Sequence, residues 1–216
     1  MKRLNKVRIE WSSKMAYVVG LLATDGCLSI DGRHIDFTSK DLGLVEIFKE
    51  NLNLSNKIGK KARGGQVEKK YFRIQFGDKS FYEFLLSIGL TPHKSKTVGP
   101  LKIPESYFPD FLRGCIDGDG SIGTFSHPES KHLQLKVRIF SASKKFLDWI
   151  KNHAETFGII GGFIQPGAGI NALTYAKSDS IILLNKIYYN GFPQSLNRKF
   201  LIAQPYLRTW RNWQPH

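Results

Sequence analysis

Apolar and polar residues follow the same helical pattern at two places in the chain. Apolar residues recur at helical spacing over residues 15–22, directly after Ser12, a typical helix N-cap residue. A second apolar stretch has Pro109 near its start, where a helix tolerates proline. The first pattern stops at Asp25 and the second at Asp119. The sequence therefore predicts two helices that each end at an aspartate.

Alternation of apolar and polar residues predicts antiparallel strands after both helices. The clearest strand covers residues 131–140, and its predicted apolar face carries Leu133, Leu135, Val137 and Ile139. Further hairpins are predicted over 27–38, 58–76 and 159–178, and further helices over 41–53, 81–88, 144–157 and 180–189. Each half of the chain thus has the order helix, two strands, helix, two strands, helix.

The order is accompanied by an internal repeat. The stretch VVGLLATDG at 18–26 corresponds to LRGCIDGDG at 112–120, and the glycines Gly20 and Gly114 lie 94 positions apart, as do the two aspartates. Later matches pair Phe37 with Phe140 at an offset of 103 and Gly89 with Gly191 at an offset of 102. We therefore predict an N-terminal unit at 1–90, a proline-containing linker at 91–107 and a C-terminal unit at 108–216.

Glycine inside a helix is unfavourable unless another backbone packs closely against it. We therefore expect Gly20 and Gly114 to pack the two helices side by side, which brings Asp25 and Asp119 together at their C-terminal ends. Two carboxylates there repel each other and meet the negative end of both helix dipoles. A divalent cation such as Mg²⁺ removes the repulsion. The alternative is that each Asp-Gly pair is only a helix stop or a turn, as we expect at Asp31-Gly32.

The paired stretches resemble the LAGLIDADG motif of homing endonucleases, in the single-chain form with two motifs. Asp25 and Asp119 match the metal-binding acidic position, and Gly20 and Gly114 match the helix-packing glycine. The second copy fits closely, whereas the first has alanine where Asp117 retains the usual acid.

The resemblance implies an α+β fold of two pseudo-symmetric αββαββα units, packed through their LAGLIDADG helices, whose antiparallel sheets form a DNA-binding saddle. It also implies Mg²⁺-dependent hydrolysis of both DNA strands, with Ca²⁺ supporting binding without cleavage. Backbone groups of Ala23 or Thr24 and of Gly118 are candidates for further metal contacts.

The family places polar or basic residues at the end of the second strand and near the end of each unit. By this resemblance Lys40, Lys94 and Lys199 are candidate catalytic lysines, although a solvated surface role is the alternative for each. Ser143 is matched to Lys40, so the two halves are unequal and the two strands are expected to be cut at different rates.

The net charge of +14, from 32 basic and 18 acidic residues, indicates a polyanionic partner, with nucleic acid as the first choice. Polar and basic residues of the strands are candidates to read base edges. An ordinary solvent-exposed sheet face is the alternative. The candidates are Ser29, Arg33, His34, Asp36, Thr38, Lys61, Arg63, Gln66, Lys70, Arg73, Gln75, Thr124, His132, Gln134, Lys136, Arg138, Gln165, Asn171 and Lys177.

Other features of the sequence indicate where in the cell the protein is found. There is no apolar run of 18 residues and no apolar signal core after the basic N-terminus, so we expect neither a membrane span nor secretion. Cys27 and Cys115 lack metal-ligand spacing and are interpreted as small buried residues in a reducing, intracellular compartment, organellar or prokaryotic. The basic, aromatic tail 207–213 is expected to pack on the second unit or to contact the nucleic-acid backbone.

The leading hypothesis is a monomeric, magnesium-dependent, site-specific DNA endonuclease with a long pseudo-palindromic or asymmetric duplex target. The alternatives are an intron RNA maturase, a non-cleaving DNA-binding regulator on the same fold, and a basic structural protein that uses the helix pair only as a core.

Overall fold

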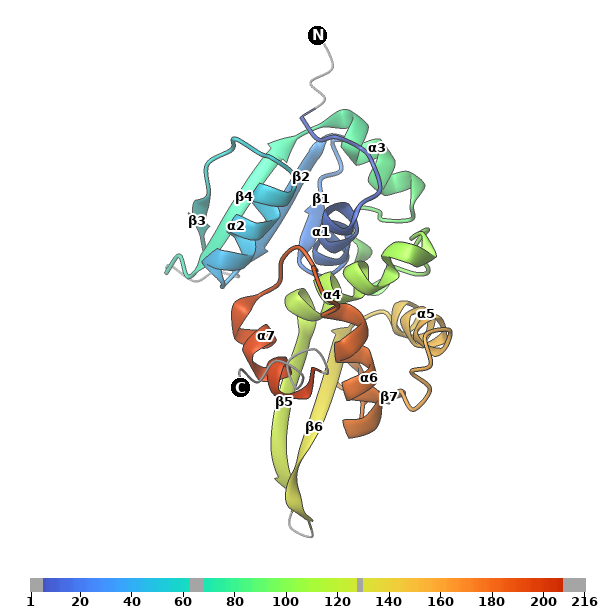
Figure 1. Ribbon diagram of the computed structural model, residues 1–216. Helices are drawn as coiled ribbons and strands as arrows, with labels where there is room; N and C mark the ends of the chain where they lie inside the picture. Colours follow the sequence, from blue (N-terminus) through green and yellow to red (C-terminus); the bar gives the residue numbers. More distant parts are fainter. Residues whose placement is uncertain (1–5, 63–67, 128–129, 208–216) are drawn as a thin grey trace.

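Two buried helices lie next to each other at the centre of the molecule (Figure 1). Helix α1 (Ser13–Thr24) begins where the Ser12 Oγ accepts a hydrogen bond from the Met15 N–H at 3.2 Å, and Asp25 is its C-cap. Helix α4 (Phe108–Asp119) has proline in its first turn. The computed structural model describes residues 6–62, 68–127 and 130–207.

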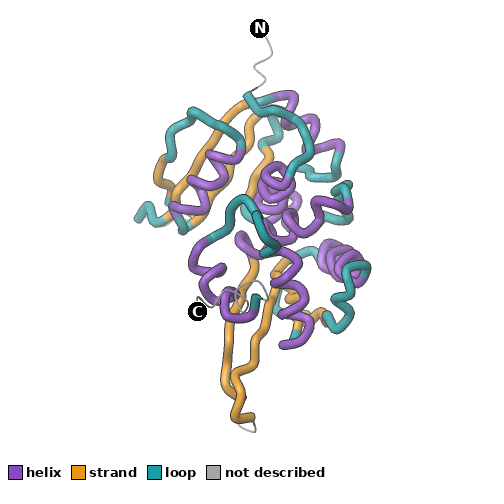
Figure 2. Tube along the Cα trace, viewed as in Figure 1, coloured by secondary structure: helices purple, strands orange, loops and turns teal. Residues whose placement is uncertain are grey.

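Each central helix leads into a four-stranded antiparallel sheet, and Figure 2 shows the two groups of strands on opposite sides of the helix pair. Sheet A has the order β1-β2-β4-β3, formed by Gly26–Leu28, His34–Ser39, Tyr71–Gly77 and Gly59–Lys61. Sheet B has the order β5-β6-β8-β7, formed by Gly120–His127, Ser130–Ser141, Asn171–Tyr175 and Phe163–Pro166. Helices α2 (Leu42–Asn51) and α3 (Lys79–Ser87) belong to the first unit, and α5 (Lys144–Glu155) and α6 (Lys177–Ile187) to the second. The predicted fold class is confirmed.

Strand pairing corrects the predicted match between the two units by one residue. In sheet A Gly26 pairs with Phe37, and in sheet B Gly120 pairs with Ile139. Phe37 is therefore equivalent to Ile139 rather than to Phe140. An apolar residue at both 139 and 140 made the two alignments indistinguishable in the sequence.

The same shift corrects the match of Lys40. The Ser39 Oγ accepts a hydrogen bond from the Asp41 N–H, and the Ser141 Oγ accepts one from the Ser143 N–H. Asp41 and Ser143 are the N-cap residues of α2 and α5, so Ser143 is equivalent to Asp41. The residue equivalent to Lys40 is Ala142.

The β5–β6 hairpin projects beyond the helices (Figure 1). Leu133, predicted to lie on the core face of β6, is 55% exposed, whereas Leu135 further along the strand is buried. Leu133 is exposed because β6 is longer than the helix layer that covers the sheet, so its first residues extend beyond that layer. On the other face the Lys136 ammonium lies 4.1 Å from the centroid of the Phe125 ring.

Segments outside the predicted helices and strands contain short helices and connect the two units. The predicted linker includes turns of 3₁₀ helix at Lys94–Lys96 and Glu105–Tyr107, and α7 (Asn197–Ala203) follows α6 before a third turn at Gln204–Tyr206. The Ser143 Oγ of the second unit donates to the Val98 carbonyl at 2.5 Å. The Arg198 Nε donates to the Asp41 carboxylate of the first unit at 3.2 Å. The second unit therefore contacts both the linker and the N-terminus of α2 in the first unit.

The two cysteines differ in their surroundings. Cys115 is buried at the helix interface, as interpreted from the sequence, whereas Cys27 is exposed, so its interpretation as a buried residue was wrong. In the part of the chain that is described, no helix combines the length and apolarity needed to cross a membrane.

Candidate metal and nucleic-acid site

The central helices touch at their glycines. A Cβ atom on Gly20 would lie 2.2 Å from the Phe111 carbonyl oxygen, and a Cβ on Gly114 would lie 2.2 Å from the Tyr17 carbonyl oxygen. Further along, a Cβ on Gly118 would lie 2.1 Å from the Thr24 Oγ1. The contacts advance in the same direction on both helices, so α1 and α4 run parallel and end together.

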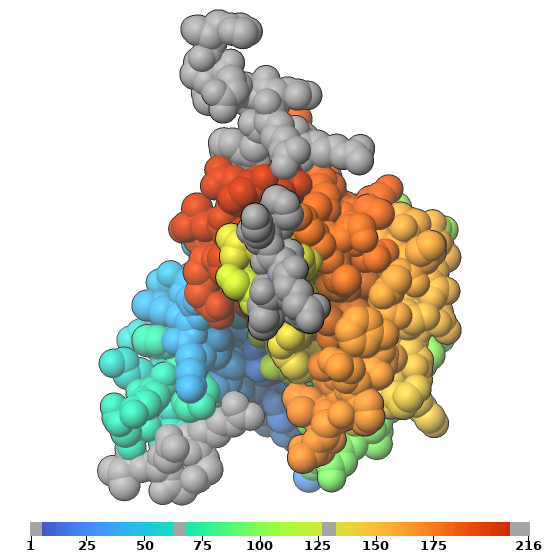
Figure 3. Space-filling model, turned by 90° about the horizontal axis from the view of Figure 1, so that it is seen from below, coloured from blue at the N-terminus to red at the C-terminus, as the bar shows by residue number. Residues whose placement is uncertain are grey.

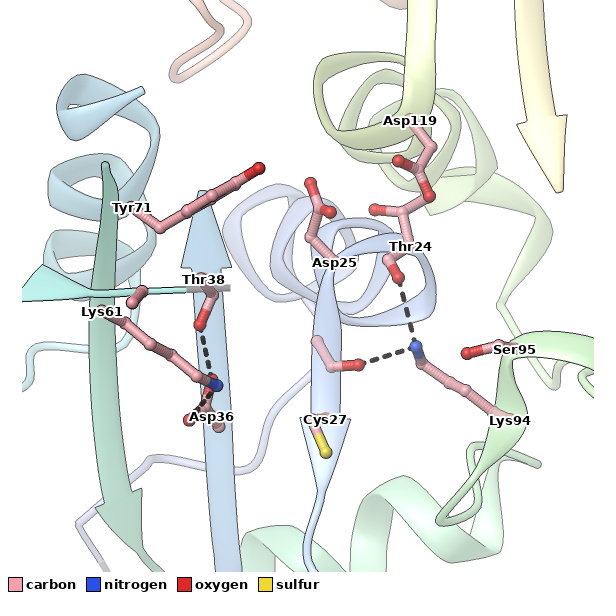
Figure 4. Close-up of a pocket in the computed structure, with 12 residues that line it drawn as sticks. Thr24, Asp25, Cys27, Asp36, Thr38, Lys61, Tyr71, Lys94, Ser95 and Asp119 are labelled. Atoms are coloured by element: carbon pink, nitrogen blue, oxygen red, sulfur yellow. Dashed lines mark hydrogen bonds and ion pairs between the residues drawn. The ribbon is translucent and has the colours of Figure 1, made fainter. Parts of the chain in front are cut away.

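Asp25 and Asp119 therefore border one cavity of about 320 Å³ at the C-terminal ends of the two helices. Figure 4 shows both carboxylates beside Thr24 at this edge of the cavity. The other lining residues come from sheet A and the segment after α3: Gly26, Cys27, Asp36, Thr38, Lys61, Ala62, Tyr71, Lys94 and Ser95. Most side chains around the cavity are polar or charged, and three are carboxylates, namely Asp25, Asp36 and Asp119.

Lys94 stabilises the end of α1 from below the cavity (Figure 4). It is only 6% exposed, and its Nζ donates to the carbonyl oxygens of Thr24 at 3.3 Å and of Gly26 at 2.7 Å. The Thr24 carbonyl belongs to the last turn of α1, where carbonyls lack helical partners, and Gly26 begins β1 directly after the helix. Burial lowers the pKa of Lys94, while the negative charges of Asp119 and Asp25 act in the opposite direction.

Lys199 stabilises the end of α4 in the corresponding way. Its Nζ donates to the carbonyl oxygens of Ile116 at 2.5 Å, Asp117 at 2.9 Å and Gly120 at 2.7 Å. Burial lowers the pKa of Lys199 to about 8, against the opposing effect of the Asp117 charge. Each unit thus places one buried lysine under the helix end that carries its aspartate.

The lowered pKa predicts a pH dependence of stability. Between the pKa of about 8 in the folded protein and the ordinary value of 10.5, the unfolded chain holds more protons, so the free energy of unfolding rises with pH. Replacing Lys199 by Met removes this contribution. Over this pH range we expect the wild type to gain about 3 kcal/mol relative to Lys199→Met, measured by urea unfolding.

The matched control is Lys145→Met on the exposed face of α5, whose stability curve should run parallel to that of the wild type. A constant difference between wild type and Lys199→Met from pH 8 to 10.5 would show that the folded protein does not depress this pKa.

Lys40, the third lysine predicted as catalytic, lies at the edge of the cavity. It is exposed, and its Nζ lies 5.5 Å from the centroid of the Tyr71 ring, which lines the cavity. Of the three lysines, Lys94 lines the cavity itself, while Lys199 faces the carbonyls behind Asp119.

An ionic cluster covers the open face of sheet A. Asp36 is 8% exposed and accepts hydrogen bonds from the Thr38 hydroxyl at 2.8 Å and from the Arg73 Nε. The Lys61 Nζ lies 3.9 Å from the same carboxylate. Cys27 pairs with Asp36 in the strand register and so lies on this face as well. The cluster presents three cationic or hydroxyl groups around one buried carboxylate.

Strand register places most of the predicted DNA-facing residues on the open faces of the two sheets. On sheet A these are Ser29, His34, Asp36, Thr38, Lys61, Arg73 and Gln75, and on sheet B they are Gln134, Lys136, Arg138 and Gln165. Arg63, Gln66 and the side chain of His132 lie outside the described residues, as does the tail after Leu207.

Five predicted residues lie elsewhere. Thr124 pairs with Leu135 on the helix-facing side of sheet B, and Asn171 pairs with Ser141 on the same side and donates to the Ser141 carbonyl at 3.4 Å. Both residues lie on the same side of the sheet as the buried Leu135 and Ile139, and this depends on a strand register that the sequence alone does not give. Lys177 begins α6, Arg33 lies in the turn capped by Asp31, and Lys70 precedes β4 and pairs with Glu68 at 2.8 Å.

Asp117, which the second motif retains, supports the segment that carries Lys199. Its Oδ2 accepts hydrogen bonds from the Tyr17 hydroxyl at 2.7 Å and the Leu196 N–H at 2.8 Å. Burial raises its pKa to about 6, while these two hydrogen bonds act in the opposite direction. Asp117 therefore has a structural function, which Ala23 in the first motif cannot supply.

The sequence did not single out Cys27 and Tyr71 as cavity residues. Tyr71 was placed correctly on the polar face of its strand, and Cys27 stands two positions after Asp25, where an alternating strand returns to that face. Counting every second residue of the strand from Asp25 would have predicted that Cys27 lies on the cavity side.

Comparison with known proteins connects this arrangement to a family. The model of the LAGLIDADG-like domain family matches residues 110–167. An uncharacterized protein of Methanocaldococcus jannaschii is 23% identical over 163 residues, which cover 74% of this chain and 60% of that protein. The match thus spans less than two thirds of the relative.

Solved structures resemble the chain over most of its length. Variants of the homing endonuclease I-DmoI superpose with a TM-score of 0.57 at 16% identity, covering 89% of this chain and 97% of theirs. The N-terminal LAGLIDADG domain of DUF199/WhiA gives 0.54 at 18% identity, with 94% and 98% covered. The I-LtrWI LAGLIDADG homing endonuclease bound to target DNA gives 0.56 at 13% identity, with 90% and 89% covered.

The chain therefore has the LAGLIDADG fold, and its second unit carries the match to the LAGLIDADG-like domain family. The resemblance predicted from the two motifs is confirmed. Structures of I-DmoI have also been solved with DNA and manganese and with DNA and calcium.

Proposed function

We propose that this protein is a site-specific DNA endonuclease that uses a divalent cation to hydrolyse both strands of its target. The observation that supports the proposal is the joint position of Asp25 and Asp119, which end two parallel helices at one cavity bordered by a basic sheet face. A structural helix pair does not require a carboxylate at both of its C-terminal ends, where the dipoles disfavour negative charge.

The residues at the cavity fit a cation that is shared with the substrate. No group of three or more His, Cys, Asp or Glu side chains suited to a metal is found among the described residues, so the protein offers two motif carboxylates rather than a closed ligand set. Mg²⁺ is commonly bound by one or two carboxylates together with waters and substrate phosphates. Asp25 and Asp119 would hold the cation, with backbone groups of Ala23, Thr24 and Gly118 nearby.

A bound divalent cation supplies charge neutralisation at the scissile phosphate and lowers the pKa of a water nucleophile. The protein contributes the position of the two carboxylates, which depends on the glycine contact between the helices. Lys94 adds a positive charge at the cavity and holds the end of α1 in place. Ca²⁺ is expected to support DNA binding without turnover.

The two sheet faces would lie along the duplex, one on each half of the target. Figure 3 shows the first unit, blue to teal, and the second unit, yellow to red, on opposite sides of the molecule when viewed from below. Basic and amide side chains on these faces suit base edges in the major groove, and the net charge of +14 suits the phosphates. One chain supplies both halves, so we propose a monomer, a long target and an intracellular location.

A non-cleaving DNA-binding regulator on the same fold is the second candidate. It is favoured by the surroundings of Asp119 in sheet B, where a smaller cavity is bordered by Phe140, Ala142 and Ile170 rather than by charged side chains. An intron RNA maturase remains a prediction from the family resemblance.

The test is a cleavage selection. The purified protein is incubated with a randomised duplex library in Mg²⁺ and separately in EDTA, and the new ends are sequenced. We expect discrete paired ends that share one sequence and appear only with Mg²⁺. A specific sequence that is enriched by pull-down but never cut would establish the regulator instead.

A further inference from the structure

The two halves of the proposed centre differ at equivalent positions. Thr38 pairs with Arg73 in sheet A, and the equivalent pair in sheet B is Phe140 with Ala172. By the same register Tyr71 corresponds to Ile170, Lys40 to Ala142 and Lys61 to Gly167. Five hydroxyl or cationic side chains of the first half are therefore replaced by apolar side chains or glycine in the second.

The cavities reflect this difference. A second hollow of about 160 Å³ lies on the sheet B side of Asp119 and shares Thr24 and Ser95 with the larger one. The remaining residues that border it are Ala23, Val98, Phe140, Ser141, Ala142, Phe146 and Ile170. Among the residues that the structure describes, no basic side chain borders the smaller hollow, whereas Lys61 and Lys94 border the larger one.

The basic side chains of the second half do not supply positive charge at the hollow next to Asp119. Lys199, equivalent to Lys94, has its ammonium bonded to three carbonyl oxygens and borders neither hollow. Arg138 stands at the position of Asp36 and pairs with Thr174 in the middle of sheet B. It adds positive charge to the DNA-facing surface but does not border the hollow next to Asp119.

Charge at the scissile phosphate affects the rate because negative charge develops on the phosphate oxygens in the transition state, where fixed cations and hydrogen-bond donors act most strongly. The first half provides Lys61, Lys94 and the Thr38 hydroxyl at the cavity. The second half has Gly167 and Phe140 at the positions of Lys61 and Thr38, and its Lys199 does not border the hollow. Apolar side chains next to a phosphate cannot supply such stabilisation.

We propose that the protein cuts the two strands one after the other, rapidly in the half of the centre next to sheet A and slowly in the half next to sheet B. Each step adds one water across a phosphodiester P–O bond and leaves a phosphate end and a hydroxyl end. The intermediate is a duplex nicked always in the same strand. This inference rests on the proposed endonuclease function.

The experiment uses the selected duplex with a different fluorophore on each strand, excess protein and Mg²⁺, and follows both strands by denaturing electrophoresis. We expect rate constants that differ at least about tenfold, equivalent to about 1.4 kcal/mol in activation free energy. Lys61→Ala should slow only the fast strand, which assigns that strand to the sheet A half. Ala142→Lys, combined with Ile170→Tyr, should accelerate only the slow strand.

Lys145→Ala, which removes an exposed charge from α5, is the control and should change neither rate. Equal rates for the two strands, or a slow strand that responds to Lys61→Ala, would overturn the inference while leaving the endonuclease function intact. Absence of any cut, with Mg²⁺ present, would overturn the proposed function and this inference together.

Discussion

Replacing either Asp25 or Asp119 by Asn should abolish double-strand cleavage of the selected duplex but leave its binding intact. The asparagine side chain keeps the shape of the aspartate but loses the charge that, in the proposed function, would hold a divalent cation between the helix ends. Loss of one carboxylate ligand is expected to reduce the cleavage rate on the order of a thousandfold, several kcal/mol of transition-state stabilisation. Binding should persist or tighten, because each substitution removes a negative charge that would face the DNA phosphates in the proposed complex.

The two quantities are measured separately, cleavage by single-turnover kinetics in Mg²⁺ and binding by gel shift in Ca²⁺. Asp148→Asn is the matched control, since this partly exposed aspartate of α5 pairs with Lys144 and borders neither cavity, and it should cleave like the wild type. If both Asp25→Asn and Asp119→Asn still linearise a plasmid that carries the target, the carboxylates are not the metal ligands.

Replacing Gly20 or Gly114 by Ala strongly destabilises the whole protein. The added methyl group would meet a backbone carbonyl at 2.2 Å in either case, and a backbone cannot rotate away as a side chain does. Separating the central helices disturbs the packing of both units, so we expect a loss of at least about 3 kcal/mol, at the upper end of the range for overpacked cores. For a chain of this length the melting temperature should fall by roughly 10 °C.

Gly123→Ala provides the comparison. Gly123 lies in β5, and a Cβ built there has no neighbour within 4 Å. The substitution should change the melting temperature by no more than a degree or two. Equal melting temperatures for Gly20→Ala and Gly123→Ala would mean that the two helices do not pack as closely as described.

The elements and their order could be predicted because each unit repeats two simple periodicities. Helices that end at Asp25 and Asp119, and strands that alternate strictly, carry their signals locally. Because of the internal repeat, each element was predicted twice, once in each unit. The position of the two aspartates at one cavity followed from the glycine pair, since only close helix packing explains glycine at the centre of both helices.

Features that depend on distant parts of the chain could not be predicted in the same way. The role of Lys199 depends on carbonyl groups about eighty positions earlier, which the local sequence around the lysine does not reveal. Leu133 is exposed because β6 extends past its covering helices, and Thr124 lies on the helix-facing side of sheet B because it pairs with Leu135. The match of Lys40 to Ala142 required the strand register.

The central claim is that Asp25 and Asp119 hold one divalent-cation centre between the helix ends, and crystallography with manganese tests it most directly. Crystals of the protein with its selected duplex are soaked in Mn²⁺, and anomalous scattering locates the metal. The claim predicts manganese within about 2.2 Å of a carboxylate oxygen of each aspartate, the reach of a hard divalent cation. Manganese bound elsewhere, with both carboxylates outside coordinating distance, would contradict it.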